Sequence, residues 1–129
     1  MFSFVKNDNG GNFPIIKIKP AAAGTYEVGI ALIADSETGY VKAASATTKP
    51  EFICACQGVA SAGDEIAVNP VYEGQEWATV FSADGSALKA GAKVTLGSDA
   101  KTVTATTTNG VAILTQDGGA SGASVIVKF

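Results

Sequence analysis

The sequence contains no histidine and no arginine, and these two absences argue against several kinds of site. Without histidine the commonest general base is missing, and neither a Ser-His-Asp nor a Cys-His nucleophile can be built. All nine basic residues are lysines, so the chain lacks the side chain that best makes bidentate contacts with phosphates and guanine bases. We therefore expect a protein that is not an enzyme, has no catalytic residues and has no nucleic-acid partner.

Charged side chains and long apolar runs are also scarce. Only 16% of the 129 residues are charged, against about a quarter in average proteins, and the net charge is −3. The longest apolar run, VGIALIA at residues 28–34, is far shorter than the ~20 residues of a membrane span. The opening residues, MFSFVKNDNGG, have no apolar stretch followed by a cleavage site. We expect no membrane partner and no export, and a weakly charged surface suited to packing against other proteins.

The chain has only two cysteines, Cys54 and Cys56, in the stretch FICACQG. A disulfide across one intervening residue would be strained, and no histidine or second cysteine pair is present to complete a zinc site. No glycine-rich phosphate loop ends in GK[ST], and no calcium-binding loop of the D-x-D-x-D-G type occurs. We predict two reduced thiols, at least one of them buried, with no metal and no cofactor.

What the sequence has in abundance is strand-forming residues separated by turn residues. Thr, Val and Ile are frequent, and turn signals recur at the spacing of about 8–12 residues that is typical of small sandwiches and barrels. No segment shows helical periodicity with caps, and the best candidate, SALKAG at 86–91, is long enough for a single turn. This pattern predicts an all-β fold, a small barrel-like or sandwich domain with at most one or two short helical turns.

Individual strands can be predicted from local patterns. PIIKIKP at 14–20 has the alternating lysines and flanking prolines of an edge strand, and residues 24–35 read as one long strand kinked at Gly29. In EWATVFS the alternation places Trp77, Thr79 and Phe81 on one face, so we expect Trp77 in the core. Residues 93–116 predict three strands joined by two hairpins, the second at Asn109-Gly110.

Three short stretches repeat one pattern: SAGDEIAV at 61–68, KAGAKVTL at 89–96 and ASGASVIV at 120–127. Each places a glycine after a small residue and two alternating apolar residues shortly afterwards. Glycine adopts backbone angles that β-branched residues avoid, and the alternation is that of a strand. We interpret all three stretches as turns that lead into strands, rather than as binding sites.

The first thirteen residues differ from the rest of the chain. Phe2, Phe4 and Val5 are apolar and Lys6 is basic, whereas residues 7–12 are Asn, Asp and Gly and precede Phe13. This composition predicts an extended N-terminal arm over residues 1–13, followed by a single β domain over residues 14–129. We hypothesise that the arm binds a partner protein; the alternative is that it adds a strand to its own chain or to a neighbouring copy.

Three blocks resemble the head decoration proteins, also called cement proteins, of tailed bacteriophages and prophages. They are FVKNDNGG, GYVKAASATTKPEFICACQGVASAGDEIAVNPVYEGQEW, and LKAGAKVTLGSDAKTVTATTTNGVAILTQDGGASGASVIVKF. The resemblance covers nearly the whole chain and rests on the residues of these blocks and on the order in which the blocks occur. It implies a β-tulip fold of the lambda-like kind and a homotrimer.

The resemblance also implies a function. Such proteins bind the outside of the expanded icosahedral head, clamp neighbouring major capsid subunits and resist the pressure of the packaged DNA, often through an N-terminal arm. We accordingly expect a virion protein that is assembled in the bacterial cytoplasm, with the major capsid protein as partner. The expected capsid contacts in this sequence are Phe2, Phe4, Val5, Lys6 and Phe13.

A second hypothesis comes from a different class of protein. Trp77, Tyr72 and Tyr40 could line a sugar-binding face, as in a cell-surface-binding β module of a phage fibre or adhesin. An aromatic platform open to solvent would favour this function, and a buried Trp77 would count against it.

Overall fold

The computed structural model describes residues 1–7 and 15–129, and within these ranges the chain forms strands and turns without a helix. The predicted all-β class is therefore confirmed. Neither of the two main sheets closes into a complete barrel in the described part of the chain.

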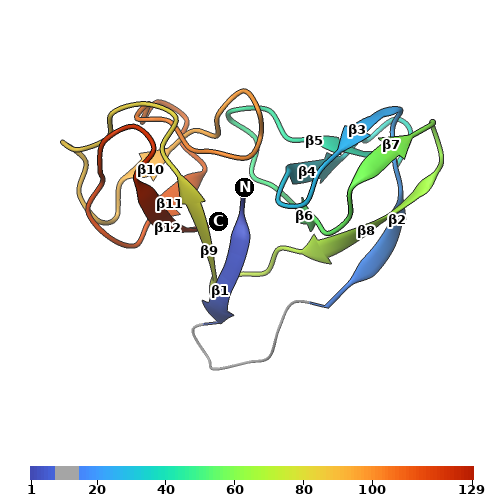
Figure 1. Cartoon of the computed structure of the whole chain (residues 1–129), viewed down its shortest axis with the longest axis horizontal. Coiled ribbons are helices and arrows are strands. Elements are labelled where there is room, and N and C mark those ends of the chain that lie inside the picture. The colour runs from blue at the N-terminus through green and yellow to red at the C-terminus, as the bar shows by residue number, and fades with distance from the viewer. Residues whose placement is uncertain (8–14) are drawn as a thin grey trace.

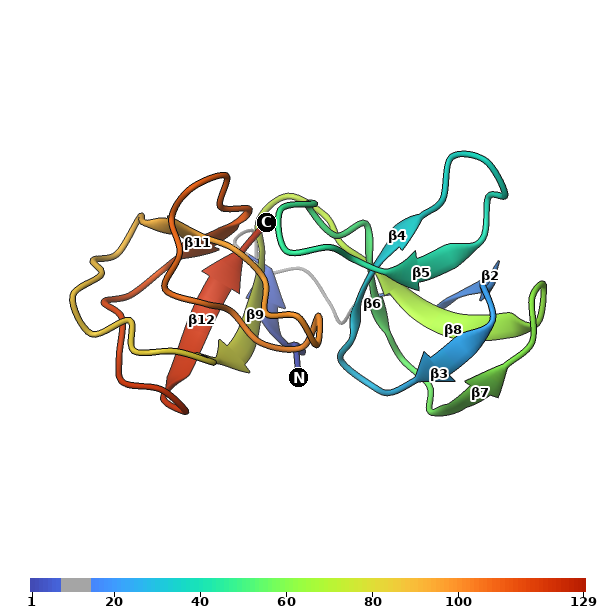
Figure 2. The same ribbon diagram turned by 90° about the horizontal axis from the view of Figure 1, so that it is seen from above.

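Two five-stranded sheets form two lobes that lie side by side (Figures 1 and 2). The C-terminal lobe contains, in spatial order, β1 (Ser3–Asn7), β9 (Gln75–Val80), β12 (Ser124–Lys128), β11 (Ala112–Leu114) and β10 (Lys93–Val94). The N-terminal lobe contains β2 (Lys17–Pro20), β8 (Glu65–Pro70), β6 (Phe52–Cys54), β4 (Ala31–Ala34) and β5 (Val41–Ala43). A two-stranded sheet of β3 (Gly24–Tyr26) and β7 (Gly58–Ala60) belongs to the N-terminal lobe.

The chain enters the C-terminal lobe twice. Strand β1 pairs antiparallel with β9, with Phe4 opposite Trp77, although β2 to β8 of the other lobe separate the two strands in sequence. The register shifts between Phe4 and Lys6, so that Val5 forms a bulge in this edge strand. The first strand of the chain is thus an edge of the sheet that the last strands build.

One apolar core extends through both lobes. Its largest fully buried side chains come from each of them, and Trp77, as the strand pattern predicts, is 1% exposed. Thr79, on the same face of β9, and Phe81, directly after the strand ends, are also buried, as expected. Backbone hydrogen bonds join the lobes, from Ala31 N–H to Ala100 O at 2.8 Å and from Leu96 N–H to Ala46 O at 2.9 Å.

The three repeated stretches are turns that lead into strands, as the sequence predicts. Gly63, Gly91 and Gly122 have φ of 89°, 89° and 84°, and the strands β8, β10 and β12 begin two residues after each glycine. In each turn the residue after the glycine donates its N–H to the carbonyl three residues earlier, over 2.9–3.0 Å. Each glycine also donates its own N–H to a distant segment at 2.8 Å, the acceptors being Ala21, Leu114 and Phe81. These hydrogen bonds attach the beginning of each strand to a segment that is distant in sequence.

Two strand predictions need correction. Residues 24–35 form two strands rather than one, because Gly29 has φ of 87° and makes a turn in which Ile30 N–H donates to Glu27 O. Between β10 and β11 the chain forms a small hairpin at 95–104, held by Thr95–Thr104 contacts and a single Leu96–Val103 bridge, rather than a full strand.

The Asn109-Gly110 turn exists, with Asn109 at φ of 56°, but residues 104–108 directly before it form no strand. Strand β11 after the turn pairs with β10, which ends at Val94. Gly110 lies so close to β10 that a Cβ would come within 2.4 Å of the Lys93 backbone, so this position requires glycine.

Candidate interaction surface

The structure places the two predicted aromatic contacts of the arm in the core of this chain. Phe2 is 2% exposed and packs edge-on against Phe129, with ring centroids 5.4 Å apart. Phe4 is partly buried and packs edge-on against Trp77 at 5.6 Å. This arrangement matches the alternative in which the arm adds a strand to its own chain, and it leaves Phe2 without access to a partner surface.

The other predicted contact residues differ in position. Val5 is 41% exposed at the bulge of β1, and Lys6 is exposed and lies 3.7 Å from the Glu76 carboxylate. Phe13 lies outside the described residues. Val5 and Lys6 are therefore the residues of the predicted set that the structure leaves on the surface.

Exposed apolar side chains concentrate near the start of the described chain. Among the described residues, the large apolar side chains with the highest exposure are Met1, Val5, Ile15, Ile16, Ile18, Val28, Val59 and Tyr72. Five of these eight lie within residues 1–18, and Ile16 and Ile18 are 64% and 57% exposed. Ile15, Ile16 and Ile18 are grouped at the start of β2 (Lys17–Pro20), and exposed apolar side chains grouped in this way indicate a candidate interaction surface.

Strand β2, the predicted edge strand, carries part of this surface. It pairs with β8 on one side, with Lys17 opposite Val68 and Lys19 opposite Ile66. Opposed residues share a face, so both lysines lie on the face of the buried Val68 and Ile66, and Ile18 lies on the other face. The sequence identifies the edge strand but does not reveal that its isoleucine is the exposed side chain.

A groove of about 420 Å³ borders the lysine face of β2. Lys17, Lys19 and Lys49 line it together with Phe52 and Tyr72. The Lys19 ammonium lies 5.5 Å from the centre of the Phe52 ring. Glu51 also lines the groove, which therefore carries more basic than acidic side chains and is partly aromatic. In the sequence, PIIKIKP indicates the edge strand but not the groove beside it.

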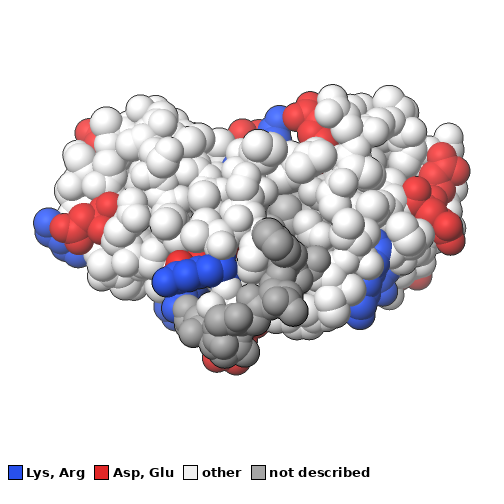
Figure 3. All heavy atoms as spheres, turned by 60° about the horizontal axis from the view of Figure 1, so that its bottom comes forward, with Lys and Arg blue, Asp and Glu red and all other residues white. Residues whose placement is uncertain are grey.

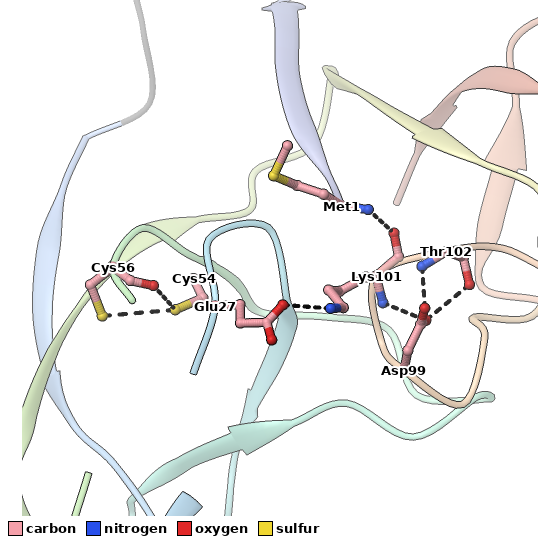
Figure 4. Close-up of polar contacts among 7 residues, drawn as sticks. All are labelled: Met1, Glu27, Cys54, Cys56, Asp99, Lys101 and Thr102. Carbon is pink, nitrogen blue, oxygen red and sulfur yellow. Dashed lines mark hydrogen bonds and ion pairs between the residues drawn. The ribbon is translucent and has the colours of Figure 1, made fainter. Parts of the chain in front are cut away.

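The two thiols lie together at the end of β6. Cys54 is 1% exposed, Cys56 is half-buried, and their Sγ atoms are 3.9 Å apart (Figure 4). Burial raises the pKa of the Cys54 thiol to about 11; a hydrogen bond with the Cys56 backbone opposes this rise, and the Cys56 thiol adds to it. The prediction that at least one thiol is buried is confirmed. No three His, Cys, Asp or Glu side chains converge on a common point within residues 1–7 and 15–129.

A polar cluster holds a loop of the C-terminal lobe against the N-terminal lobe. The Lys101 ammonium contacts the Glu27 carboxylate at 2.5 Å, and the Asp99 carboxylate accepts hydrogen bonds from the N–H groups of Lys101 and Thr102 (Figure 4). The Glu27 hydrogen bond raises the pKa of Lys101. Partial burial opposes ionisation of Asp99, but these hydrogen bonds hold its pKa below the ordinary value. We assign this cluster a structural role.

The aromatic residues of the sugar-binding hypothesis are dispersed. Trp77 is buried, Tyr40 is half-buried, and Tyr72 is 48% exposed. Tyr72 lines the lysine groove, whereas the Tyr40 hydroxyl lies next to the turn at Gly63. Buried Trp77 counts against this hypothesis, as stated above.

The comparisons with known proteins assign no family. No family model matches the chain, and no curated protein matches its sequence. In the described part of the chain, no helix has the length and apolarity needed to cross a bilayer.

Proposed function

We propose that this protein decorates and stabilises phage heads, as a trimer that binds the outer surface of the expanded icosahedral capsid and clamps major capsid subunits. The observation that carries the proposal is that exposed apolar side chains lie on or next to two edge strands, Val5 on β1 and Ile15, Ile16 and Ile18 at the start of β2. The resemblance to head decoration proteins supplies the identity of the partner. The expected location is the surface of the virion, after assembly in the bacterial cytoplasm.

The structure changes which part of the N-terminal segment we expect to touch the capsid. Phe2 and Phe4 stabilise β1 within the C-terminal lobe. Val5 and Lys6 on the outside of β1, and Ile16 and Ile18 near or in β2, remain accessible. The proposed contact is therefore the pair of edge strands rather than a free aromatic arm.

The face shown in Figure 3 is consistent with this kind of contact. Most of its area carries no charged side chain, and the lysines and acidic residues form a few separate groups. A weakly charged surface can approach another protein with little cost of removing water from ions.

Co-sedimentation with expanded phage heads tests the proposal. The double variant Ile16→Ser/Ile18→Ser removes two exposed apolar side chains and should bind heads at least about tenfold more weakly, because each loses roughly 1 kcal/mol or more of buried apolar contact. Val59→Ser is the matched control, since Val59 is 82% exposed on β7. It should bind as the unchanged protein does.

Two results would contradict the proposal. If the unchanged protein does not sediment with expanded heads, the assigned function is wrong. If it does, but the isoleucine variant and the Val59 control bind equally well, the function stands and the contact lies on another surface.

A further inference from the structure

The open edge of β2 has a defined polarity. Ala21 N–H donates to Asp64 O, on the side of β8, and alternate residues of a strand direct their backbone groups to the same side. Lys19 and Lys17 therefore direct their N–H and C=O groups toward β8, and Ile18 directs its own groups away from the sheet. Pro20 lies on that same outer side, where its missing N–H removes no bond to β8.

Among the residues that the structure describes, only the beginning of this edge has no strand paired to it. Past Pro20 the chain is paired on its outer side, because Ala22 N–H donates to Val41 O and Ala21 forms a parallel bridge with Val41 of β5. The part that can accept another strand is therefore the region of Lys17, Ile18 and Lys19.

The lysines beside this edge form no ion pairs within the described part of the chain. Lys6, Lys42, Lys89 and Lys101 each form an ion pair within the chain. In contrast, Lys17, Lys19 and Lys49 form no ion pair with any residue of the ranges 1–7 and 15–129, although the protein as a whole is acidic. The described lining of the groove thus has three lysines without an acidic partner in these ranges against one acidic residue, Glu51, and this excess of positive charge favours a negatively charged occupant.

The alternation of β2 then defines the occupant. A strand paired with β2 would place alternate side chains beside Lys17 and Lys19, on the sheet face that carries the groove, and the intervening side chain beside exposed Ile18. We propose that the edge of β2 and its lysine groove bind an extended segment of a partner protein in which acidic residues alternate with apolar ones. The proposal deepens the proposed function and depends on it only for the identity of that partner.

A second copy of this chain fits the edge poorly. In the symmetric antiparallel pairing centred on Ile18, Lys17 of one copy would face Lys19 of the other, and like charges directly opposite each other are destabilising. Repulsion between these lysines therefore disfavours a second copy and favours a partner with a different sequence.

Peptide binding in solution tests the inference without any capsid. The probe is an acetylated peptide of alternating Glu and Val, and its controls are a Lys-Val peptide and a Glu-Val peptide N-methylated at alternate residues. Amide chemical shifts of the ¹⁵N-labelled protein are recorded up to millimolar peptide. We expect the Glu-Val peptide to shift the signals of residues 15–19 and 66–68, and neither control peptide to do so.

Variants connect the binding to the groove. K17E/K19E should weaken binding of the Glu-Val peptide by at least about tenfold, because two attractive charge pairs become repulsive. K93E makes the same type of charge change at an exposed lysine of β10 in the other lobe and should change binding by less than about twofold. Unchanged spectra and light-scattering mass establish that K17E/K19E keeps its fold and oligomeric state.

Several outcomes would overturn the inference. They are the absence of shifts at residues 15–19 at millimolar peptide, equal losses in K17E/K19E and K93E, and equal binding of the N-methylated peptide. A changed mass of K17E/K19E without any peptide binding would identify the edge as a contact between copies. Peptide binding by a protein that does not sediment with heads would leave this inference intact and refute the proposed function.

Discussion

At the scale of single residues, the three turn glycines show how local conformation is fixed. Gly122 has φ of 84°, and an added Cβ would meet no atom within 4 Å. Alanine at this position is therefore opposed by backbone conformation alone, because its Cβ would overlap no neighbouring atom.

Because backbone conformation and steric overlap are separate at Gly122, the cost of the conformation alone can be predicted. Gly122→Ala should lower the free energy of unfolding by about 1–2 kcal/mol, because alanine adopts positive φ with strain. Gly122→Asn should lower it less, since asparagine tolerates this region better. Gly24→Ala is the control, because Gly24 has no positive φ and an added Cβ would meet Tyr26 at an ordinary 3.8 Å; its effect should stay within about 0.5 kcal/mol. Urea denaturation measures all three, and equal losses at both positions would contradict the conformational explanation.

At the scale of elements, β1 determines how the N-terminal segment behaves. Its pairing with β9 and the burial of Phe2 make the strand part of the C-terminal sheet. The Phe2 side chain is 2% exposed, so its burial stabilises the fold by a large amount. Val5 at the bulge is 41% exposed, so its side chain stabilises the fold less.

We therefore predict that Phe2→Ala lowers the free energy of unfolding by about 3–5 kcal/mol, as expected for a fully buried phenylalanine. Val5→Ala should lower it by less than about 1 kcal/mol. Deletion of residues 2–11 should destabilise the protein at least as strongly as Phe2→Ala, because it removes β1. Thermal and urea unfolding measure these changes, and a deletion variant as stable as the full chain would show that β1 is dispensable.

The sequence predicts those structural features that are determined by residues close to one another along the chain. The alternation that buries Trp77, the three glycine turns and the edge position of β2 are all local, and all are confirmed. The position of Phe2 depends instead on contact with Phe129 at the far end of the sequence, which no local pattern contains. The groove likewise brings Lys49 beside Lys17 and Lys19 only after β6, β8 and β2 have paired.

At the scale of the whole molecule, the two lobes share one core and a set of direct contacts. Phe2 N–H donates to Gly29 O at 3.0 Å, Ala31 N–H donates to Ala100 O, and the Glu27–Lys101 ion pair spans the same junction. With no separate core for each lobe, we expect both to unfold together.

Two natural probes can test this cooperativity. The single tryptophan, Trp77, reports on the C-terminal lobe, and the Cys54 thiol, which is buried and has a pKa of about 11, reports on the N-terminal lobe. In a Cys56→Ser variant, the reaction of Cys54 with a thiol reagent and the change in Trp77 fluorescence should have the same urea midpoint. Distinct midpoints for the two probes would show that the lobes unfold separately.

The pairing of β1 with β9 also has a consequence for the order in which the protein forms during translation. Phe4 is opposite Trp77, so β1 can pair only after a strand about 70 residues further along the chain has been synthesised. At roughly 5–20 residues per second, the ribosome needs several seconds to synthesise this length. During that interval the strands of the N-terminal lobe emerge and can pair, while Phe2 and Phe4 have no sheet to join. Until β9 is made, the rings of Phe2 and Phe4 have no sheet to pack into, and chaperones that recognise exposed apolar segments have their longest opportunity to bind at this strand.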